Sequence, residues 1–459
     1  MTVLLPAADA ASACPIWCVT AEDWPALAET LAETLPGPAA AFARATGFKA
    51  KPGTHALLPD AAGGLAGVVA GLDPKGDPFA TAKLADSLPE GSYRFAAPPP
   101  QPALAALAWR LSAYRFARYR DRPAPGARLV LPEGVDPAEI GRIADAVAAG
   151  RDLVNTPAND LGPAEIETAS RSLAERSGAA CAVVSGEALE RDFPMIAAVG
   201  RASERAPRLI DLTWGDGAAP KVTLVGKGVA FDTGGLDIKP SAAMLLMKKD
   251  MAGAAAALAA AEMVMGAGLR VRLRVLIPTV ENAISGSAFR PGDVLRSRKG
   301  LTVEIGNTDA EGRLILADAL ALADEESPDL VIDFATLTGA ARVALGPDLP
   351  ALFTEDDALA SAMAEAGRAV NDPVWRMPLW APYASLLDSK IADINHVSGG
   401  PFAGAVTAAL FLRRFAPTAK AHAHLDLYGW NPSTKPGRPE GGEVQTARLV
   451  YELLKRRYG

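Results

Sequence analysis

The second half of the chain alternates short β-rich runs with longer helical segments. The β-rich runs are residues 221–226, 270–280, 301–306, 329–337 and 423–430, and helical patterns begin near residues 251 and 311. Parallel strands need crossover connections of this length, and the crossover helices cover both faces of the sheet. The pattern therefore predicts an α/β domain around a mostly parallel, mixed sheet. In such sheets, functional residues collect at the carboxyl ends of the strands.

A chain of 459 residues exceeds the size of one ordinary core, so two folding units are expected. Residues 137–157, PAEIGRIADAVAAGRDLVNTP, have apolar positions at helical spacing and end in the stop signals Asn155 and Pro157. We interpret this segment as the helix that links two domains. The predicted boundaries are residues 1–148 for the smaller N-terminal domain, including the linker helix, and 149–459 for the larger domain.

Charge and composition argue against two broad classes of protein. The net charge of −7 argues against a general nucleic-acid binder, because the phosphate backbone attracts basic surfaces. The most apolar long segment, residues 251–269, is mostly alanine, contains Glu262 and follows Lys248, Lys249 and Asp250. These charges favour a buried helix over a membrane span. We therefore expect neither a membrane nor a nucleic acid as partner.

The amino-terminal segment and the cysteines indicate an intracellular protein. No lysine or arginine precedes Arg44, so the basic region of a secretory signal is missing. The three cysteines, Cys14, Cys18 and Cys181, fit neither a disulfide framework nor a zinc signature. We interpret them as ordinary thiols of a reducing compartment, and the predicted location is the cytoplasm.

Two polar loops of the larger domain carry most of the unusual charge. The first is VGKGVAFDTGGLDIKPSAAMLLMKKDM, residues 225–251, and the second is GNTDAEGRLIL, residues 306–316. Their clustered charges are Lys227, Asp232, Asp237, Lys239 and Asp250 in the first loop and Asp309, Glu311 and Arg313 in the second.

Turn, nucleotide-binding and capping roles account for only part of these loops. The first loop is compatible with a solvated glycine-rich turn. It lacks the Ser or Thr of a P-loop, and Phe231 stands at the third glycine of a Rossmann pattern. In the second loop, Asp309 can cap a helix and Glu311 can favour its first turn. Neither role explains Arg313.

Four carboxylates are expected to meet at the ends of neighbouring strands: Asp232, Asp250, Asp309 and Glu311. Carboxylates that crowd into a water-poor cleft stay protonated unless a cation neutralises them. Oxygen ligands suit Mg, Mn and Zn, and bridging carboxylates hold two ions roughly 3.5–4 Å apart for hydrolysis by an activated water. The two loops therefore predict a metal site.

The lysines and histidines leave alternatives open. A protonated Lys239 can polarise a substrate carbonyl and stabilise the oxyanion that forms. Lys227 can be a neutral amine ligand if its pKa is lowered, but a salt bridge to a nearby carboxylate is the simpler role. His422 and His424 face the same side of a strand, which fits either a ligand pair or packing. The sequence contains no H-E-x-x-H and no G-x-S-x-G motif.

The two loops resemble those of the leucyl aminopeptidase family, the dimetal cytosol aminopeptidases of the M17 type. The similarity rests on VGKGVAFDTGGLDIKPSAAMLLMKKDMAGAAA and NTDAEGRLILADAL. It extends from RDLVNTPAND at residue 151 to near the carboxyl terminus, through ATLTGA (335–340) and GAVTAALFLRRF (404–415). The resemblance implies a smaller N-terminal α/β domain, a larger catalytic α/β/α domain and a homo-hexamer.

The resemblance also implies a role for individual residues. Two divalent ions, Mn or Zn, would be held by Lys227, Asp232, Asp250, Asp309 and Glu311. Lys239 would lie beside the scissile carbonyl. Arg313 would hold a bicarbonate ion that acts as general base toward the bridging water. The substrate-binding residues would be Met247, Thr336 and Gly339 around the side-chain pocket and Leu337 along the substrate backbone.

The implied reaction is metal-dependent hydrolysis of the N-terminal residue, leucine or another mostly apolar amino acid, from peptide substrates. One ion would bind the free α-amine. A DNA-binding architectural role on the same fold and a dimetal amidase of other specificity remain as alternatives. Two segments near the expected pocket, residues 395–405 and 427–445, depart from the family pattern. These departures concern the side-chain preference rather than the metal chemistry.

Overall fold

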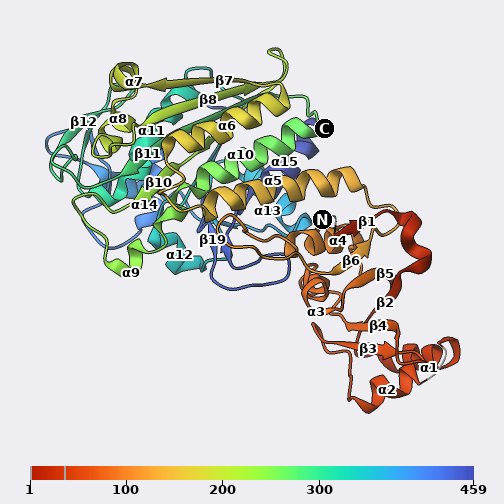
Figure 1. The fold of residues 1–459 in the computed structure, drawn as a ribbon. Coiled ribbons are helices and arrows are strands. Elements are labelled where there is room, and N and C mark those ends of the chain that lie inside the picture. Colours follow the sequence, from red (N-terminus) through yellow and green to blue (C-terminus); the bar gives the residue numbers. More distant parts are fainter. Residues whose placement is uncertain (1–2, 36–37) are drawn as a thin grey trace. The chain divides into compact units, whose positions relative to one another are not determined.

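The structure, a computed structural model, describes residues 3–35 and 38–459, which form two compact units (Figure 1). The first unit comprises residues up to Ala148 together with Ser433–Glu440, and the second comprises Ala149–Pro432 together with Gly441–Gly459. Both units are α/β, as predicted. The sequence did not predict that residues 433–440 belong to the first unit, because only contacts between residues far apart in the chain reveal it.

The first unit is built on a six-stranded sheet with the order β1-β6-β5-β2-β4-β3, in which only β3 and β4 pair antiparallel. Its strands are β1 (Leu4–Leu5), β2 (Cys14–Val19), β3 (His55–Pro59), β4 (Leu65–Gly71), β5 (Gly91–Ala97) and β6 (Ala127–Val130). Its helices are α1 (Trp24–Thr34), α2 (Ala39–Ala45), α3 (Leu84–Ser87) and α4 (Pro102–Ser112), and α5 (Pro137–Asn155) begins here. Trp24, Ala28 and Leu31 form one face of α1 and pack into the core of this unit.

The second unit is built on a nine-stranded sheet. Eight strands follow the order β16-β15-β18-β14-β9-β11-β8-β7, and β10 pairs with β11. The strands are β7 (Ala180–Ser185), β8 (Arg208–Trp214), β9 (Lys221–Gly226), β10 (Gly228–Asp232), β11 (Arg272–Asn282), β14 (Leu330–Ala335), β15 (Ala351–Phe353), β16 (Trp375–Arg376) and β18 (His422–Asp426). Antiparallel pairs occur at β7–β8, β8–β11 and β15–β18, and the other pairs are parallel. This is the mostly parallel, mixed sheet that the sequence predicts.

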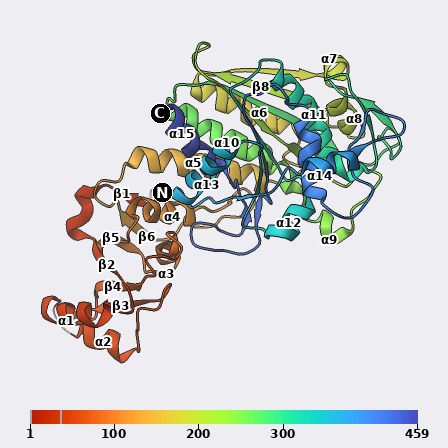
Figure 2. The ribbon, with the colours of Figure 1, turned by 180° about the vertical axis from the view of Figure 1, so that it is seen from behind.

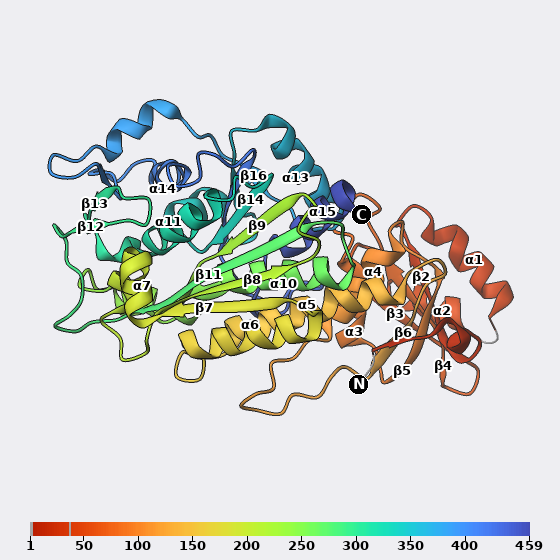
Figure 3. The ribbon, with the colours of Figure 1, turned by 90° about the horizontal axis from the view of Figure 1, so that it is seen from above.

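Helices cover both faces of the nine-stranded sheet (Figures 2 and 3). The helices of this unit are α6 (Pro163–Ser177), α7 (Gly186–Asp192), α8 (Pro194–Gly200), α9 (Ser241–Met244), α10 (Ala252–Gly266), α11 (Glu311–Asp324), α12 (Gly339–Leu345), α13 (Asp357–Ala369), α14 (Gly404–Arg413) and α15 (Ala447–Tyr458). On one face α10 contacts β9 and β14 and packs against α6 and α15. On the other face α11 contacts β9 and β11 and packs against α8 and α14.

Helix α10 is almost entirely buried, as predicted for the alanine-rich segment. Its first turn lies against the end of β14, since a Cβ on Gly253 would come within 2.2 Å of the Phe334 carbonyl oxygen. Glycine at this position therefore permits the close approach of helix and strand. Within residues 3–35 and 38–459, no helix has both the length and the apolar character that a membrane crossing needs.

The structure differs from the prediction at two strands, one placed in the wrong sheet and one not predicted. Residues 302–304 form β13 (Thr302–Glu304) in a separate sheet with β12 (Val294–Arg296) and β17 (Ile394–Asn395), not a strand of the main sheet. The short connection from β12 favours a local antiparallel pair. The glycine-rich first loop contains β10, which the scattered glycines and charges concealed. A further pair, β19 (Trp430–Asn431) and β20 (Gly441–Gly442), follows β18.

Four parallel strands of the main sheet end at the same edge. Strands β9, β10, β14 and β18 end at Gly226, Asp232, Ala335 and Asp426. The carboxyl ends of parallel strands lie together, so the residues at and just after these ends share one edge of the sheet. The fold thereby collects residues of both polar loops at this edge.

Candidate active site

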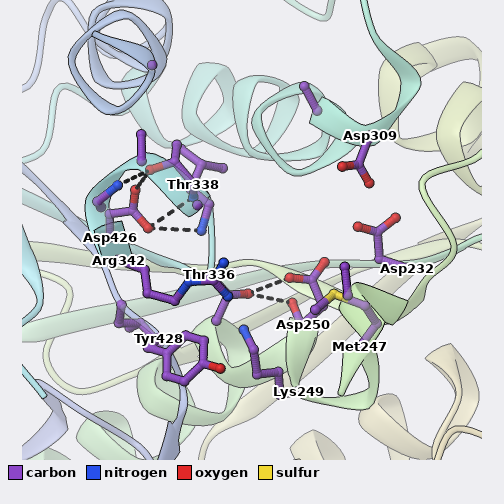
Figure 4. Close-up of a pocket in the computed structure, with 18 of the residues that line it drawn as sticks. Asp232, Met247, Lys249, Asp250, Asp309, Thr336, Thr338, Arg342, Asp426 and Tyr428 are labelled. Carbon is purple, nitrogen blue, oxygen red and sulfur yellow. Dashed lines mark hydrogen bonds between the residues drawn. The ribbon is translucent and has the colours of Figure 1, made fainter. Parts of the chain in front are cut away.

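Carboxylates from separate parts of the chain meet at this edge (Figure 4). Asp232 ends β10, Asp250 lies in the 3-10 helix η3 (Met247–Met251), Asp309 lies in η4 (Thr308–Ala310), and Glu311 begins α11. Oxygen atoms of Asp232, Asp309 and Glu311 lie within 4.8 Å of one another. Asp232, Asp250 and Glu311 are buried. The structure thus brings together the four carboxylates that the sequence predicts to meet.

Two lysines lie among these carboxylates. The Lys227 Nζ lies 2.8 Å from Asp250 Oδ2 and 2.9 Å from Glu311 Oε1, and it donates a hydrogen bond to the Thr336 carbonyl. Lys239 pairs with Asp232 at 2.8 Å and also contacts Asp309. Burial alone would lower the pKa of each amine, but the neighbouring carboxylates outweigh burial and raise both pKa values. Without a metal both lysines are therefore cations in salt bridges, the simpler role expected for Lys227.

The pKa values of two of the carboxyl groups are also raised. Burial, followed by the charge of Asp232, raises the pKa of Asp309 to about 6. The same two causes raise the pKa of Glu311 well above its ordinary value. Negative charge is therefore in excess at this point, even with two lysines present.

Three of the carboxylate oxygens are free to accept a further partner. Asp250 Oδ2, Asp309 Oδ1 and Glu311 Oε1 are buried, and none accepts a hydrogen bond from any residue that the structure describes. Each of the three oxygens lies within ion-pair distance of a lysine ammonium group. Oxygen donors in this arrangement fit a divalent cation such as Mg, Mn or Zn.

Arg313 of α11 lies beside the carboxylates. It is buried, its Nη1 donates a hydrogen bond of 2.7 Å to the His396 carbonyl, and its Nε has no acceptor among the described residues. Burial lowers its pKa to about 10, so the guanidinium remains charged at neutral pH. Arg313 therefore retains a donor and a positive charge for an anion.

A cavity of about 690 Å³ opens at the same place. It is lined by all four residues predicted to bind substrate, which are Met247, Thr336, Leu337 and Gly339. The Thr336 hydroxyl donates a hydrogen bond of 2.8 Å to Asp250 Oδ1, so this wall of the cavity is tied to the carboxylates. Lys227, Asp232, Lys239, Asp250, Asp309 and Arg313 also line the cavity.

Sequence profiles of known families match both parts of the chain. The profile of the cytosol aminopeptidase family, catalytic domain, matches residues 148–453, and the profile of the M17 aminopeptidase N-terminal domain matches residues 22–132. The chain belongs to the cytosol aminopeptidase family. The predicted resemblance to the M17 metallo-exopeptidases is thereby confirmed.

Individual relatives and solved structures agree with this family assignment. The probable cytosol aminopeptidase of Syntrophotalea carbinolica is 45% identical over 318 residues, which cover 68% of this chain and 64% of that protein. The matched part of this chain thus spans just under two thirds of that relative. The crystal structure of the cytosol aminopeptidase from Coxiella burnetii has 44% identity and a TM-score of 0.95, with 100% of both chains covered. The bottromycin maturation enzyme BotP, solved in complex with Mn, has 34% identity and a TM-score of 0.84, with 97% of this chain and 99% of that chain covered.

Several residues that hold the candidate site in place were not predicted. The Asn282 side chain, at the end of β11, donates to Asp232 Oδ1 at 2.8 Å and to the Thr308 carbonyl at 3.1 Å. The backbone N–H of Thr308 donates to Asp237 Oδ2 at 2.7 Å. These bonds join the two polar loops. A polar residue at the end of a buried strand was the signal that could have identified Asn282.

Asp426 at the end of β18 was also missed. It is buried, and it accepts hydrogen bonds from the backbone N–H groups of Leu337 and Thr338 and from the Thr338 hydroxyl. The Thr338 hydroxyl in turn accepts from the Ala341 N–H at the start of α12. Asp426 therefore fixes the cavity wall that contains Leu337 and Gly339.

The helix-capping alternative for Asp309 is wrong. The apolar helix α11 begins at Glu311 after Ala310, which forms no side-chain cap. Asn307 caps the preceding 3-10 helix η4, because its side chain accepts a hydrogen bond of 2.7 Å from the Asp309 backbone N–H. The side chain of Asp309 is instead turned toward Lys239 and Asp232. Capping therefore leaves the carboxylate free for another role.

His422 and His424 do not form a ligand pair in the cavity. Both rings bind the buried carboxylate of Asp333 on the neighbouring strand β14, through His422 Nε2 at 2.7 Å and His424 Nδ1 at 2.5 Å. Neither ring is among the described residues that line the cavity. The structure therefore gives both histidines a structural role between β14 and β18 and not a ligand role.

Gly312→Ala is expected to impair the site without unfolding the protein. A Cβ at this position would lie 2.6 Å from Lys227 Cε and 2.7 Å from Lys227 Nζ, so the lysine side chain must move. Lys227 is held by Asp250, Glu311 and the Thr336 carbonyl. Displacement of reacting groups by about 1 Å costs roughly 100-fold in rate, and a loss of that size in kcat/KM is expected.

Gly141→Ala is the matched control, because Gly141 also lies inside a helix but a Cβ there meets nothing within 4 Å. Alanine is the better helix former, so this control is expected to gain up to about 1 kcal/mol of stability and to keep its turnover. Wild-type turnover in Gly312→Ala would show that the position of Lys227 does not matter.

Proposed function

We propose that this chain is a metal-dependent aminopeptidase that hydrolyses the N-terminal residue from peptides. One observation carries the proposal: three buried carboxylate oxygens lack a hydrogen bond from any described residue and lie at a cavity of about 690 Å³. That volume lies in the range of small-molecule sites, about 300–1,000 Å³. Membership of the cytosol aminopeptidase family supports the same reaction.

We assign the metal-holding role to Lys227, Asp232, Asp250, Asp309 and Glu311. Two divalent ions, Mn or Zn, are proposed per subunit, and the Mn complex of BotP supports manganese. When bound, such ions activate water for attack and act as Lewis acids on the substrate carbonyl. Lys227 must lose its proton to take part, because an ammonium group has no lone pair to donate.

Lys239 is proposed to stabilise the substrate oxygen on which negative charge develops. Its pKa is raised, so it remains an ammonium at neutral pH, and it lies 2.8 Å from Asp232 Oδ2. A fixed cation in a site that excludes water lowers the free energy of such an oxyanion. Arg313 is proposed to hold a bicarbonate ion, which supplies a general base, and its free Nε–H supports binding of an anion.

The substrate's N-terminal side chain is proposed to enter the wall formed by Met247, Thr336 and Gly339, with Leu337 along the peptide backbone. The hydrogen bonds of Asp426 to Leu337 and Thr338 keep this wall in one position. A preference for leucine or other mostly apolar residues stays a prediction, as do the homo-hexamer and the cytoplasmic location.

Removal of metal is expected to abolish turnover, and addition of Mn is expected to restore it. The measurement is hydrolysis of leucine 4-nitroanilide after dialysis against a chelator, with metal content determined on the same sample. Mn at 100 times its dissociation constant should also stabilise the fold by about 2.7 kcal/mol, seen as a higher melting temperature.

N-acetyl-leucine 4-nitroanilide is the matched control substrate, because it lacks only the free amine and should not be hydrolysed. Full turnover by metal-free protein would overturn the proposal. Faster hydrolysis of phosphate esters than of peptide amides would favour a different dimetal hydrolase.

A further inference from the structure

Two cations in the cavity differ from the lysines of the carboxylate cluster. Lys249 of η3 and Arg342 of α12 both line the cavity. Lys249 is only 5% exposed, whereas Arg342 is exposed. Lys227 and Lys239 each pair with two carboxylates. Neither Lys249 nor Arg342 forms an ion pair with a carboxylate among the described residues.

Both cations lie against one aromatic ring. The Lys249 Nζ lies 4.5 Å and the Arg342 Cζ lies 5.4 Å from the centroid of the Tyr428 ring. The backbone around this ring is fixed, since the Tyr428 and Gly429 N–H groups each donate a hydrogen bond of 3.0 Å to Gln445 Oε1. A ring face attracts cations but does not neutralise their charge. The positive charge therefore remains available to a ligand.

The carboxylates nearest to Lys249 have other partners. Asp250 pairs with Lys227 and accepts from the Thr336 hydroxyl. Asp426 accepts three hydrogen bonds from Leu337 and Thr338. A buried ammonium without its own counter-ion is costly, and an anion in the cavity would offset that cost.

The position of Lys249 indicates that the substrate's first side chain can supply this anion. It lies two residues after Met247 and next to Asp250, and Figure 4 shows its side chain between Tyr428 and Asp250. In the proposed function, the substrate's N-terminal residue lies at the carboxylates that hold the metal, and its side chain enters the wall formed by Met247, Thr336 and Gly339. That side chain then points toward Lys249.

We propose that the side-chain pocket accepts an acidic N-terminal residue, glutamate or aspartate, whose carboxylate pairs with Lys249 inside the pocket and with Arg342 at its mouth. This inference rests on the proposed aminopeptidase function and adds a substrate class to the apolar residues expected for it. The substrate's own charge would supply the counter-ion that Lys249 lacks.

The first test compares glutamate, glutamine and leucine 4-nitroanilides with the Mn-loaded protein. Glutamate and glutamine have the same shape and differ in charge, and these substrates have no terminal carboxylate that could replace the side chain. A charge-assisted hydrogen bond to a buried group corresponds to about 10- to 100-fold in kcat/KM, so glutamate is expected to exceed glutamine by that factor.

The second test removes the cation. Lys249→Met is expected to lower the glutamate-to-glutamine ratio of kcat/KM by about 10- to 100-fold. Arg342→Gln should lower it less, because Arg342 is exposed, and this surface change keeps the test valid if Lys249→Met does not fold. Lys248→Met is the matched control. The Lys248 Nζ donates to the Asn155 carbonyl at 2.7 Å, and Lys248 is not among the described residues that line the cavity, so the ratio should not change.

A binding measurement gives a readout apart from turnover. Calorimetric titration of the Mn-loaded protein with free L-glutamate and L-glutamine should show tighter binding of glutamate, and Lys249→Met should remove the difference. Hydrolysis of leucine and glutamine substrates without a preference for glutamate would overturn this inference and leave the aminopeptidase proposal standing. A preference that survives in Lys249→Met would overturn the assignment to Lys249. Hydrolysis of none of the three substrates would overturn both proposals.

Discussion

Asp309→Asn is expected to abolish turnover of peptide amides while leaving the fold intact. Asparagine keeps the shape of the side chain but removes the negative charge that is proposed to hold an ion beside Asp232 and Glu311. Loss of an outer-shell partner of a metal ligand already costs about 10- to 100-fold in affinity or activity, so the loss of a ligand should cost more. The measurement is kcat/KM of the Mn-loaded variant, together with its metal content.

The melting temperature of metal-free Asp309→Asn distinguishes the loss of a metal ligand from damage to the fold. Burial and Asp232 raise the pKa of Asp309 from 3.8 to about 6. The folded state therefore binds more protons than the unfolded state in this interval, and metal-free wild type should lose stability as pH rises through it. The variant lacks this loss, so without metal at neutral pH it should melt at or above the wild-type temperature.

The matched control for this variant is Asp388→Asn, because Asp388 is exposed and is not among the described residues that line the cavity. The control should keep wild-type turnover. Near-normal turnover in Asp309→Asn would mean that the ligand assignment is wrong, and a large drop in its metal-free melting temperature would mean that Asp309 is structural.

Asp333→Asn is expected to cause the largest loss of stability. Asp333 lies in β14 with 0% exposure, and its two oxygens bind His422 and His424 of β18. Asparagine can accept only one of these bonds and carries no charge. Removal of one partner from a buried charged group costs about 3–5 kcal/mol, because the other partner stays buried without compensation. Denaturant unfolding at pH 6 measures this loss.

Asp333 and its histidine partners also make the stability of the wild type depend on pH. Burial alone would raise the pKa of Asp333, but the two histidines lower it to about 2, so its contribution is present above 3.8 and is lost as pH falls toward 2. Burial alone would lower the pKa of His424, but Asp333 raises it above 6.5. That contribution is present below 6.5 and is lost as pH rises through the raised pKa.

The control for this effect is Asp329→Asn. Asp329 lies one residue before the same strand and pairs with Lys420, which is largely exposed. Pairs of this kind contribute little, so the control should unfold close to wild type at pH 6. If Asp333→Asn has the stability and pH profile of wild type, the two histidines are held by packing alone.

The fold class could be predicted because it depends on local patterns. Apolar strands such as residues 221–226 and the alanine-rich helix after residue 251 have clear periods, and their alternation indicates a parallel sheet. Strand β10 was missed because glycines and charges interrupt its pattern, and β13 was placed in the wrong sheet. Which strands pair is decided by contacts between distant residues, which no short window of sequence contains.

The residues of the candidate site also fall into those that the sequence could predict and those that it could not. The carboxylates were identifiable because they cluster in two short loops at predicted strand ends, where unneutralised charge demands a partner. Asn282, Asp426 and Tyr428 stand alone in the sequence, and nothing near them indicates their contacts with Asp232, Leu337 or Lys249. Lys249 shows this difference most clearly, because the sequence gives no reason to distinguish it from its neighbour Lys248.

By itself, the sequence determined a two-domain α/β protein with a charged cluster that calls for metal, because periodicity and crowded charge are local properties. Only the tertiary structure decided which charges are satisfied. Lys227 and Lys239 are surrounded by carboxylates, whereas Lys249 is buried against Tyr428 with no carboxylate paired to it among the described residues. Whether a charge has a partner depends on distances between segments far apart in the chain, and those distances exist only once the chain has folded.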